Sequence, residues 1–359
     1  MIVKFVATKL PVFIFSFIIF LSIYLVATFF RLRNPKDTSI VSFERLAEIE
    51  RRIREGRINP DGHRVLKIVM MTRNEYPLIV SWIEYHGKVY GSENLYIIDA
   101  SDEPKVIAAL KSAEKLGVSV NYSHANLNEV QVEIDDLMKS LVPSCDLVIK
   151  LDTDEFIAYY NPITLSLSTD RNVIMSYLDS LAFDGRKYTI GYYAINTNVT
   201  KGCIADNPVK SFTTFALFPW PKFKVIVPAA TFHSMDLGGH VGTVVAPYNG
   251  EPHNTNITIF HYHNHCYQRL MTVTKQAIMR HNYIHLNQSA SIQIEILTHL
   301  SKGYPKVCNI NSCHKVFGYL QHLLDPELSE LNYIKGVRAM ERPGVRIVST
   351  TLVKDLLVT

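Results

Sequence analysis

The sequence predicts an α/β domain built around a parallel sheet, and three observations support this class. Four short apolar segments alternate with three amphipathic segments of helical periodicity between residues 65 and 151. Apolar runs of this length are typical of strands that are buried on both faces, as in parallel sheets. Polar residues follow several of these runs, and ligands bind at that end of the strands in such sheets.

The overall composition excludes several classes of protein. The chain has 359 residues, of which 47% are hydrophobic and 19% are charged, so it is not intrinsically disordered. Its formal net charge of +4 is too small to indicate a nucleic-acid-binding protein, and we expect no nucleic-acid partner. Hydrophobic residues are concentrated at the N-terminus, so an apolar segment precedes a body of ordinary composition.

The N-terminal segment predicts a membrane anchor. The stretch from Leu10 to Phe30 contains no charged residue, and as a helix it would extend about 31 Å, which matches the hydrocarbon thickness of a bilayer. A secretory signal peptide usually has a shorter apolar region, of roughly 7–15 residues, followed by small residues at a cleavage site. We therefore predict a short tail over residues 1–9 and one uncleaved transmembrane helix over residues 10–30.

The orientation of this anchor does not follow from charge, because basic residues flank it on both sides. Four Asn-x-Ser/Thr sequons favour a lumenal body, and they begin at Asn121, Asn198, Asn256 and Asn287. Such triplets also occur by chance, so they support a lumenal orientation without establishing it.

A stem follows the anchor. Apolar residues recur there at helical spacing, at Phe43, Leu46, Ile49 and Ile53. Ser42 is placed to cap this helix, and the sequence Asn-Pro-Asp-Gly at residues 59–62 is typical of a turn. We predict a solvated stem over residues 31–62 and one large domain over residues 63–359.

Strands and helices alternate in the first half of that domain. The strands are apolar runs bounded by polar or turn residues, at Val65–Met71, Leu95–Ile98, Val118–Tyr122 and Leu147–Leu151. The helices between them are amphipathic, at Leu78–Tyr90, Lys105–Leu116 and Glu129–Leu141. In the first helix Ile79, Ile83 and His86 share one face, and the second helix ends before Gly117.

Polar side chains follow three of the four strands. They are Thr72, Arg73, Asn74 and Glu75 after the first strand, Asp99 and Ser101 after the second, and Asp152 and Asp154 after the fourth. Because parallel strands end at the same edge, we expect these residues to line one ligand site. The chain contains neither G-x-G-x-x-G nor G-x-x-x-x-G-K-S/T, which argues against a dinucleotide-dependent oxidoreductase and a P-loop kinase.

Two acidic residues at the end of the fourth strand predict a cation site. Asp152 and Asp154 occupy alternate positions, so a continuing strand would point both carboxylates to one side. Two carboxylates on one rim suit Mg²⁺ or Mn²⁺, which bridge to diphosphate oxygens. The alternative is a strand-end turn that is capped by aspartate.

A histidine cluster later in the chain supplies a further ligand. His261, His263 and His265 alternate with other residues and would share one face of a strand. Their spacing from the cysteines matches no established zinc finger or ribbon, so structural zinc is the weaker interpretation. We favour one histidine of this group completing the Mg²⁺ or Mn²⁺ site that begins with Asp154.

Several motifs also resemble a known family. They are Met70–Glu75 (Met-Met-Thr-Arg-Asn-Glu), Trp82–His86 (Trp-Ile-Glu-Tyr-His), Leu95–Asp102, Asp152–Phe156 (Asp-Thr-Asp-Glu-Phe), Lys224–Pro228 with His233, and Phe260–Tyr262. In this order, between residues 65 and 275, they resemble motifs of glycosyltransferase family 92 (DUF23) and related family 2-like glycosyltransferases. The resemblance implies a GT-A fold, a nucleotide-sugar donor, a divalent cation (Mn²⁺ or Mg²⁺), and a single-pass type II membrane protein of the Golgi or ER lumen.

The resemblance also implies residue roles. Asp152 and Asp154 match the family's motif for the metal and the donor diphosphate, and His261 matches a third metal ligand. The implied nucleotide-sugar pocket is lined by Thr72, Arg73, Asn74, Glu75, Asp99, Ser101, Asp152 and Lys224.

These features together predict a metal-dependent glycosyltransferase. It would transfer a sugar from a donor such as UDP-galactose or another UDP-hexose to a glycan or glycoconjugate acceptor, with inversion. We expect Asp236 to be the general base, with Glu251 and Glu155 as other candidates. Two alternatives stay open, namely a metal-dependent hydrolase and a non-catalytic, membrane-anchored glycan-binding module.

Overall fold

A computed structural model describes residues 41–59, 62–123, 125, 127–197, 214–219, 224–262, 288–302 and 346–349, with a few further residues between 270 and 325. The chain divides into two compact units, residues 1–48 and residues 49–359. The predicted tail and membrane anchor lie outside the described residues. Among the helices that are described, none combines the length and apolar character that crossing a bilayer requires.

The predicted stem helix is present as α2 (Phe43–Glu55). The Ser42 hydroxyl accepts a hydrogen bond from the Arg45 amide at 3.2 Å, which is the capping contact that the sequence predicts. Ile49 is the only buried residue of this helix, so most of its surface is solvated, as expected. Within the larger unit, Arg52 Nη2 donates to the Cys145 carbonyl oxygen at 2.7 Å.

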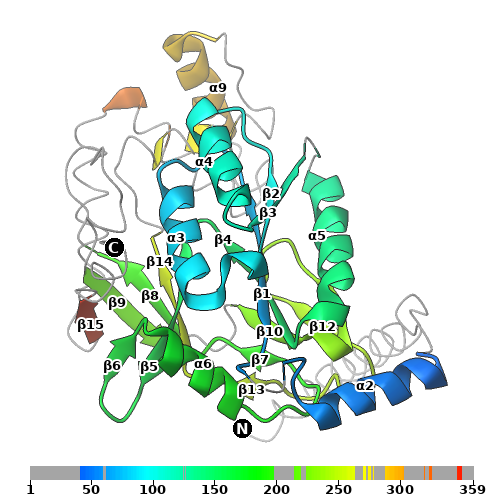
Figure 1. The fold of residues 1–359 in the computed structure, drawn as a ribbon. Coiled ribbons are helices and arrows are strands. Elements are labelled where there is room, and N and C mark those ends of the chain that lie inside the picture. Colours follow the sequence, from blue (N-terminus) through cyan, green and yellow to red (C-terminus); the bar gives the residue numbers. More distant parts are fainter. Residues whose placement is uncertain are drawn as a thin grey trace, which may run out of the picture. The chain divides into compact units, whose positions relative to one another are not determined.

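The four predicted strands form the parallel part of a seven-stranded sheet (Figure 1). They are β1 (Leu66–Thr72), β2 (Leu95–Asp99), β3 (Ser119–Tyr122) and β4 (Leu147–Asp152). Their order in the sheet is β4-β1-β2-β3, and every neighbouring pair among them is parallel. The predicted α/β class with a parallel sheet is therefore confirmed for this part of the chain.

The same sheet continues beyond β4 with three further strands, of which only the one in the family motif Lys224–Pro228 was anticipated. They are β10 (Val225–Pro228), β7 (Tyr188–Thr189) and β13 (His253–Asn254). Strand β10 is antiparallel to both β4 and β7, so the sheet is mixed and not purely parallel. A separate hairpin of β11 (Phe232–Met235) and β12 (Gly242–Val244) follows β10.

A second sheet of six strands was also not predicted. Its order is β15 (Arg346–Ser349), β9 (Thr214–Pro219), β8 (Tyr192–Asn196), β14 (Ile257–His261), β5 (Glu155–Asn161) and β6 (Ser166–Ser168). Strand β5 begins directly after the turn that follows β4. The chain therefore passes from the first sheet to the second at residues 153–154.

Helices cover both faces of the parallel strands (Figure 1). Besides α2, the described α-helices are α3 (Leu78–Tyr90), α4 (Pro104–Glu114), α5 (Leu127–Leu141), α6 (Arg171–Ser180) and α9 (Ala290–Lys302). Ile68 and Met70 of β1 pack in one cluster with α3, α4 and the second sheet, whereas Val69 packs in another cluster with α5. This alternation places α3 and α4 on one face and α5 on the other.

The face of α3 that was predicted from periodicity lies in the core. His86 has no exposed surface, and its ring centroid lies 4.3 Å from that of Trp82 and 5.5 Å from that of Phe156. Its Nδ1 lies 3.0 Å from the Trp82 carbonyl oxygen, so the neutral ring donates there. Burial lowers the pKa of His86 to about 3, although the hydrogen bond to Trp82 opposes this shift.

The buried His86 predicts an acid-sensitive fold. In the unfolded chain the pKa of His86 returns to about 6.5, whereas in the folded chain it is about 3. Between these two pH values the unfolded state therefore binds a proton that the folded state does not. Stability should therefore fall as the pH falls through this window, by up to about 1.4 kcal/mol per pH unit. We expect His86→Phe to flatten this dependence, measured as the thermal midpoint between pH 7 and pH 5. Equal loss of stability in both proteins would contradict the assignment.

Candidate active site

The ends of three parallel strands meet at one edge of the seven-stranded sheet. Strand β1 lies between β2 and β4, and the register pairs Thr72 with Asp99 and Met71 with Asp152. The chain leaves β1 toward β2 and β3 on one side and returns to β4 on the other. The β1–β4 boundary is thus a topological switch point, where ligands bind to open α/β sheets. The predicted convergence of these strand ends is confirmed.

The loops after β1 and β2 are joined by Asn74. This residue has a φ of 57°, and its Oδ1 accepts hydrogen bonds from the amides of Asp102 and Glu103 at 3.1 and 3.0 Å. Its Nδ2 donates to Asp102 Oδ1 at 2.6 Å. The Asn74 side chain is therefore committed to holding the second loop, and its predicted contact with a nucleotide would have to use other atoms.

Asp99 is buried at the end of β2 and is held by Ser101. Oδ1 of Asp99 accepts from both the amide and the hydroxyl of Ser101, whose hydroxyl accepts in turn from the Asn74 amide at 2.8 Å. Close by, the Thr72 hydroxyl is buried without a hydrogen-bond partner in the described part of the chain. A buried hydroxyl of this kind calls for a partner such as a water or a ligand.

Two other predicted residues lie on the loop after β1. The Arg73 side chain is exposed, and that of Glu75 is half-buried. The Glu75 carbonyl oxygen accepts the Ile79 amide at 3.0 Å, at the start of α3. The loop therefore leads directly into the helix, with Arg73 at its exposed rim.

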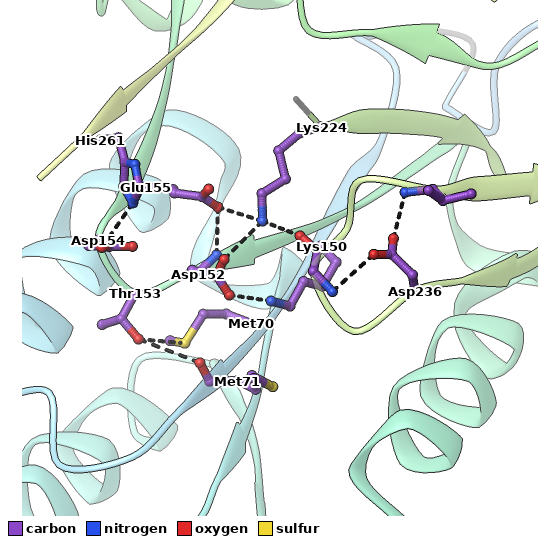
Figure 2. Close-up of polar contacts among 12 residues, drawn as sticks. Met70, Met71, Lys150, Asp152, Thr153, Asp154, Glu155, Lys224, Asp236 and His261 are labelled. Atoms are coloured by element: carbon purple, nitrogen blue, oxygen red, sulfur yellow. Dashed lines mark hydrogen bonds and ion pairs between the residues drawn. The ribbon is translucent and has the colours of Figure 1, made fainter. Parts of the chain in front are cut away.

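Asp152, at the end of β4, is the centre of a buried charge network (Figure 2). Its Oδ1 pairs with Lys150 Nζ, and its Oδ2 lies 3.0 Å from Lys224 Nζ. The side chains of Lys150 and Lys224 are 1% and 0% exposed, whereas that of Asp152 is 38% exposed. The lysines thus approach Asp152 from the protein interior, and the carboxylate itself faces outward.

Lys224 has three acceptors for its three N–H donors. Besides Asp152, its Nζ lies 2.8 Å from Glu155 Oε2 and donates to the Gly238 carbonyl oxygen. Glu155 Oε2 also accepts the Asp152 amide at 2.8 Å. A fully buried and saturated ammonium cannot reach a bound ligand without giving up one of these contacts. The structure therefore favours an indirect role for Lys224 over its predicted direct contact with the nucleotide sugar.

Electrostatics separate the roles of these groups. Burial opposes ionisation of Asp152, but the charges of Lys224 and Lys150 outweigh it and hold the pKa of the Asp152 carboxyl below its usual value. Burial raises the pKa of Glu155, and the nearby Lys224 only partly offsets this rise. Burial alone would lower the pKa of Lys224, yet the carboxylates of Glu155 and Asp152 raise it above its usual value. Asp152 and Lys224 are therefore a charged pair.

Asp154 belongs to a different group of side chains. Strand β4 ends at Asp152, so Asp154 lies in the following turn and does not continue the strand alternation on which our prediction depended. Its Oδ2 lies 3.0 Å from Nε2 of His261, the last residue of β14, and its carbonyl oxygen accepts the Tyr262 amide at 2.8 Å. The two acidic residues of the motif therefore face different partners (Figure 2).

His261 is held beside this carboxylate. Burial would lower the pKa of His261, but the charge and the hydrogen bond of Asp154 outweigh burial and raise it above its usual value. Its ring centroid lies 5.0 Å from that of Tyr193 on β8. The later histidines of the predicted cluster, His263 and His265, lie outside the described residues.

Of the predicted set of three ligands, the structure brings Asp154 and His261 together, with Oδ2 and Nε2 3.0 Å apart, the distance of a hydrogen bond. Carboxylate and imidazole are both groups that could hold a divalent cation. Both oxygens of Asp152 instead pair with lysines. Across the described residues, no group of three His, Cys, Asp or Glu side chains is arranged to hold a metal. A role for Asp152 as a direct ligand stays a prediction.

Asp236, the predicted general base, lies in the loop of the β11–β12 hairpin. Its two carboxylate oxygens accept hydrogen bonds from the amides of Gly238 and Val241, at 3.2 and 2.6 Å (Figure 2). Its backbone amide donates to the Val241 carbonyl oxygen at 3.1 Å. This geometry favours a role in shaping the loop.

Two features of the site were missed in the sequence. Lys150 interrupts an apolar strand two residues before Asp152, and the period of a strand puts both side chains on one face. Gly239 has a φ of 70°, and a Cβ there would lie 2.7 Å from the Lys150 carbonyl oxygen. The Gly-Gly turn therefore lies directly against β4. The lysine was visible as a charge in an apolar run, whereas the turn's position depends on tertiary structure.

The geometry of Asp236 predicts that its charge is not essential. Asp236→Asn keeps one acceptor oxygen for the hairpin amides, and we expect it to lower stability by about 1 kcal/mol while activity falls less than tenfold. Donor turnover and the thermal midpoint would be measured together. A loss of activity of about a thousandfold with an unchanged thermal midpoint would restore Asp236 as the general base.

Comparison with known proteins does not identify a family. No protein-family model and no curated relative match the chain. A cytidylyltransferase from Leptospira borgpetersenii aligns over 47% of this chain and 62% of its own, with 15% identity and a TM-score of 0.25. A putative glucose-1-phosphate thymidylyltransferase from Bacillus anthracis aligns over 59% and 75%, with 12% identity and a TM-score of 0.24. These similarities are too weak to assign a function, so the assignment depends on the residues of the site.

Proposed function

We propose that this protein is a metal-dependent glycosyltransferase that uses a nucleotide-sugar donor. One observation carries the proposal: Asp99, Asp152 and Asp154 converge at the carboxyl ends of β2 and β4, on either side of β1. Carboxylates at a switch point can accept hydrogen bonds from the hydroxyl groups of a sugar and from an N–H of a nucleobase. They can also hold a cation that binds the diphosphate of the same ligand. The GT-A fold and family 92 membership are part of this proposal.

Asp99 is suited to recognise the nucleobase. Within the described part of the chain, both of its side-chain hydrogen bonds from Ser101 reach Oδ1, which leaves Oδ2 for a ligand. An ionised carboxylate only accepts hydrogen bonds, so it matches a base with a ring N–H, as in uracil or guanine. This supports a UDP or GDP donor, and a UDP-hexose such as UDP-galactose is our first choice.

Asp154 and His261 are the residues that would hold the cation. A mixed carboxylate and imidazole pair suits Mn²⁺ better than Mg²⁺, which prefers oxygen ligands alone. A divalent cation, when bound there, stabilises the negative charge that develops on the departing diphosphate. Asp152 would accept hydrogen bonds from donor hydroxyl groups, because its outward face is exposed while lysines hold its inner face.

Transfer to an acceptor hydroxyl also requires removal of its proton. We propose inversion with a carboxylate base and a glycan or glycoconjugate acceptor. Asp236, the base expected from the sequence, is not our choice for this role, because both of its carboxylate oxygens accept hydrogen bonds from hairpin amides. The predicted helix over residues 10–30 would anchor the enzyme as a single-pass type II protein, with the body in the Golgi or ER lumen.

Calorimetric titration of the full-length chain in a mild detergent tests the proposal. With MnCl₂ present, UDP should bind with a Kd on the order of 1 µM to 1 mM, the range of ordinary substrate affinities. Asp154→Ala should weaken Mn²⁺ binding at least about tenfold, as loss of a metal-site residue does. Because the Asp154 side chain is partly exposed, the midpoint of thermal unfolding of the Asp154→Ala variant should differ from that of the wild type by only a few degrees.

A screen of UDP- and GDP-sugars with the same protein then separates the alternatives. Transfer or slow hydrolysis of one donor supports a glycosyltransferase. Turnover of p-nitrophenyl phosphate without any sugar nucleotide would support the hydrolase. Binding of glycans with no affinity for UDP or GDP would support the non-catalytic module, and either of these results would contradict the proposal.

A further inference from the structure

Two buried lysines converge on one carboxylate at the donor edge. Lys150 lies within β4, and Lys224 immediately precedes β10, the strand that pairs antiparallel with β4. Both ammonium groups point toward Asp152 from the interior (Figure 2). Asp152 is the only acceptor of Lys150 in the part of the chain that is described.

This arrangement is not explained by stability. Removing an ammonium group from water costs several kcal/mol, and the side chains of both lysines are almost fully buried. Apolar residues of similar volume are often as stabilising as a buried ion pair. Ile149 and Leu151, the neighbours of Lys150 in β4, are apolar and fully buried on the opposite face of the strand. The Lys150 side chain is itself only 1% exposed, so a buried charge at this position calls for a reason other than stability.

The lysines restrict the carboxylate of Asp152 to one orientation. A carboxylate has about four lone-pair sites, and each of its two oxygens here uses at least one site for a lysine. The remaining sites lie on the exposed side of the group. An unpaired aspartate at a strand end would rotate freely and would have to be ordered when a ligand binds, which weakens binding.

Lys224 connects the same carboxylate to the neighbouring hairpin. Its third contact is the Gly238 carbonyl oxygen, and the Val225 amide donates to the Gly239 carbonyl oxygen at 3.2 Å. Gly239 lies so close to β4 that a Cβ would collide with the Lys150 carbonyl oxygen. One ammonium group therefore fixes the hairpin turn and Asp152 together.

We infer that Lys150 and Lys224 are positioning residues that hold Asp152 ready to bind the nucleotide, without touching the nucleotide themselves. The inference rests on the proposed function, because it assumes a nucleotide at this edge. Lys150 acts through Asp152 alone, whereas Lys224 also places the Gly238–Gly239 turn beside it.

A double-mutant cycle with Lys150 and Asp152 tests the inference on the full-length protein. UDP binding with MnCl₂ would be measured for the wild type, Lys150→Met, Asp152→Asn and the double variant. We expect Lys150→Met to weaken UDP binding at least tenfold. In the Asp152→Asn background the same lysine substitution should change the Kd less than twofold, because the group it positions is already lost.

Two further readouts separate positioning from general damage. Mn²⁺ affinity without nucleotide should stay within twofold in Lys150→Met, because Asp154 and His261 are held by other contacts. The matched control is Lys187→Met: Lys187 Nζ donates to the Gly242 carbonyl oxygen of the same hairpin at 3.0 Å but does not contact Asp152. This variant should leave the Kd for UDP within twofold of the wild type.

Three results would overturn the inference. The first is an equal loss of UDP affinity on Lys150→Met in both backgrounds, which would show that the lysine acts independently of Asp152. The second is an equal loss in the Lys187 control. The third applies if Lys150→Met alone does not fold. The double variant, which removes both charges, is then compared with Asp152→Asn, and weaker UDP binding by the double variant would overturn the inference.

Failure of the proposed function has a different signature. A wild-type protein that binds neither UDP nor GDP would contradict the proposed function and the ligand part of this inference. The thermal midpoints of the same four proteins would then decide whether the lysine holds Asp152. If the effects of Lys150→Met and Asp152→Asn on the thermal midpoint simply add, the statement that Lys150 holds Asp152 would be overturned too. A smaller effect of Lys150→Met in the Asp152→Asn background than in the wild type would support it.

Discussion

Asp152 shares its two carboxylate oxygens with two ammonium groups that the fold has removed from water. Each charge is tolerable only because the others are present, since an unpaired buried ion is strongly destabilising. The network requires β10 to lie antiparallel beside β4, so that a residue just before β10 reaches the end of β4. This network therefore links three features, namely the order of the strands in the sheet, the position of the Gly238–Gly239 turn and the orientation of the Asp152 carboxylate.

The two acidic residues of the Asp152–Phe156 motif have different surroundings. Asp152 ends a strand of the seven-stranded sheet, whereas Asp154 lies in the turn that leads into the second sheet and faces His261 of β14. The first acidic residue is balanced by cations of the protein, and the second has a partner that can also ligate a metal. The candidate site lies where the chain passes between the two sheets.

Local patterns in the sequence were enough to predict the parallel strands and their helices. Apolar runs identified β1 to β4, and the bounds of α3 were predicted to the residue. The second sheet was missed because its strands come from distant segments, such as β5 and β14, whose pairing leaves no local signal. The partner of Asp154, His261, was named through the family resemblance, and the structure places the two side by side. The expectation that Asp154 points to the same side as Asp152 was wrong, because the strand ends at Asp152.

The central claim is that this strand edge binds a cation together with a nucleotide diphosphate. Pulsed electron paramagnetic resonance of Mn²⁺ bound to the full-length protein tests it most directly. With UDP present, we predict hyperfine couplings to one imidazole nitrogen, lost in His261→Ala, and to the ³¹P nuclei of the diphosphate. A spectrum of fully hydrated Mn²⁺, with neither coupling at saturating UDP, would contradict the account.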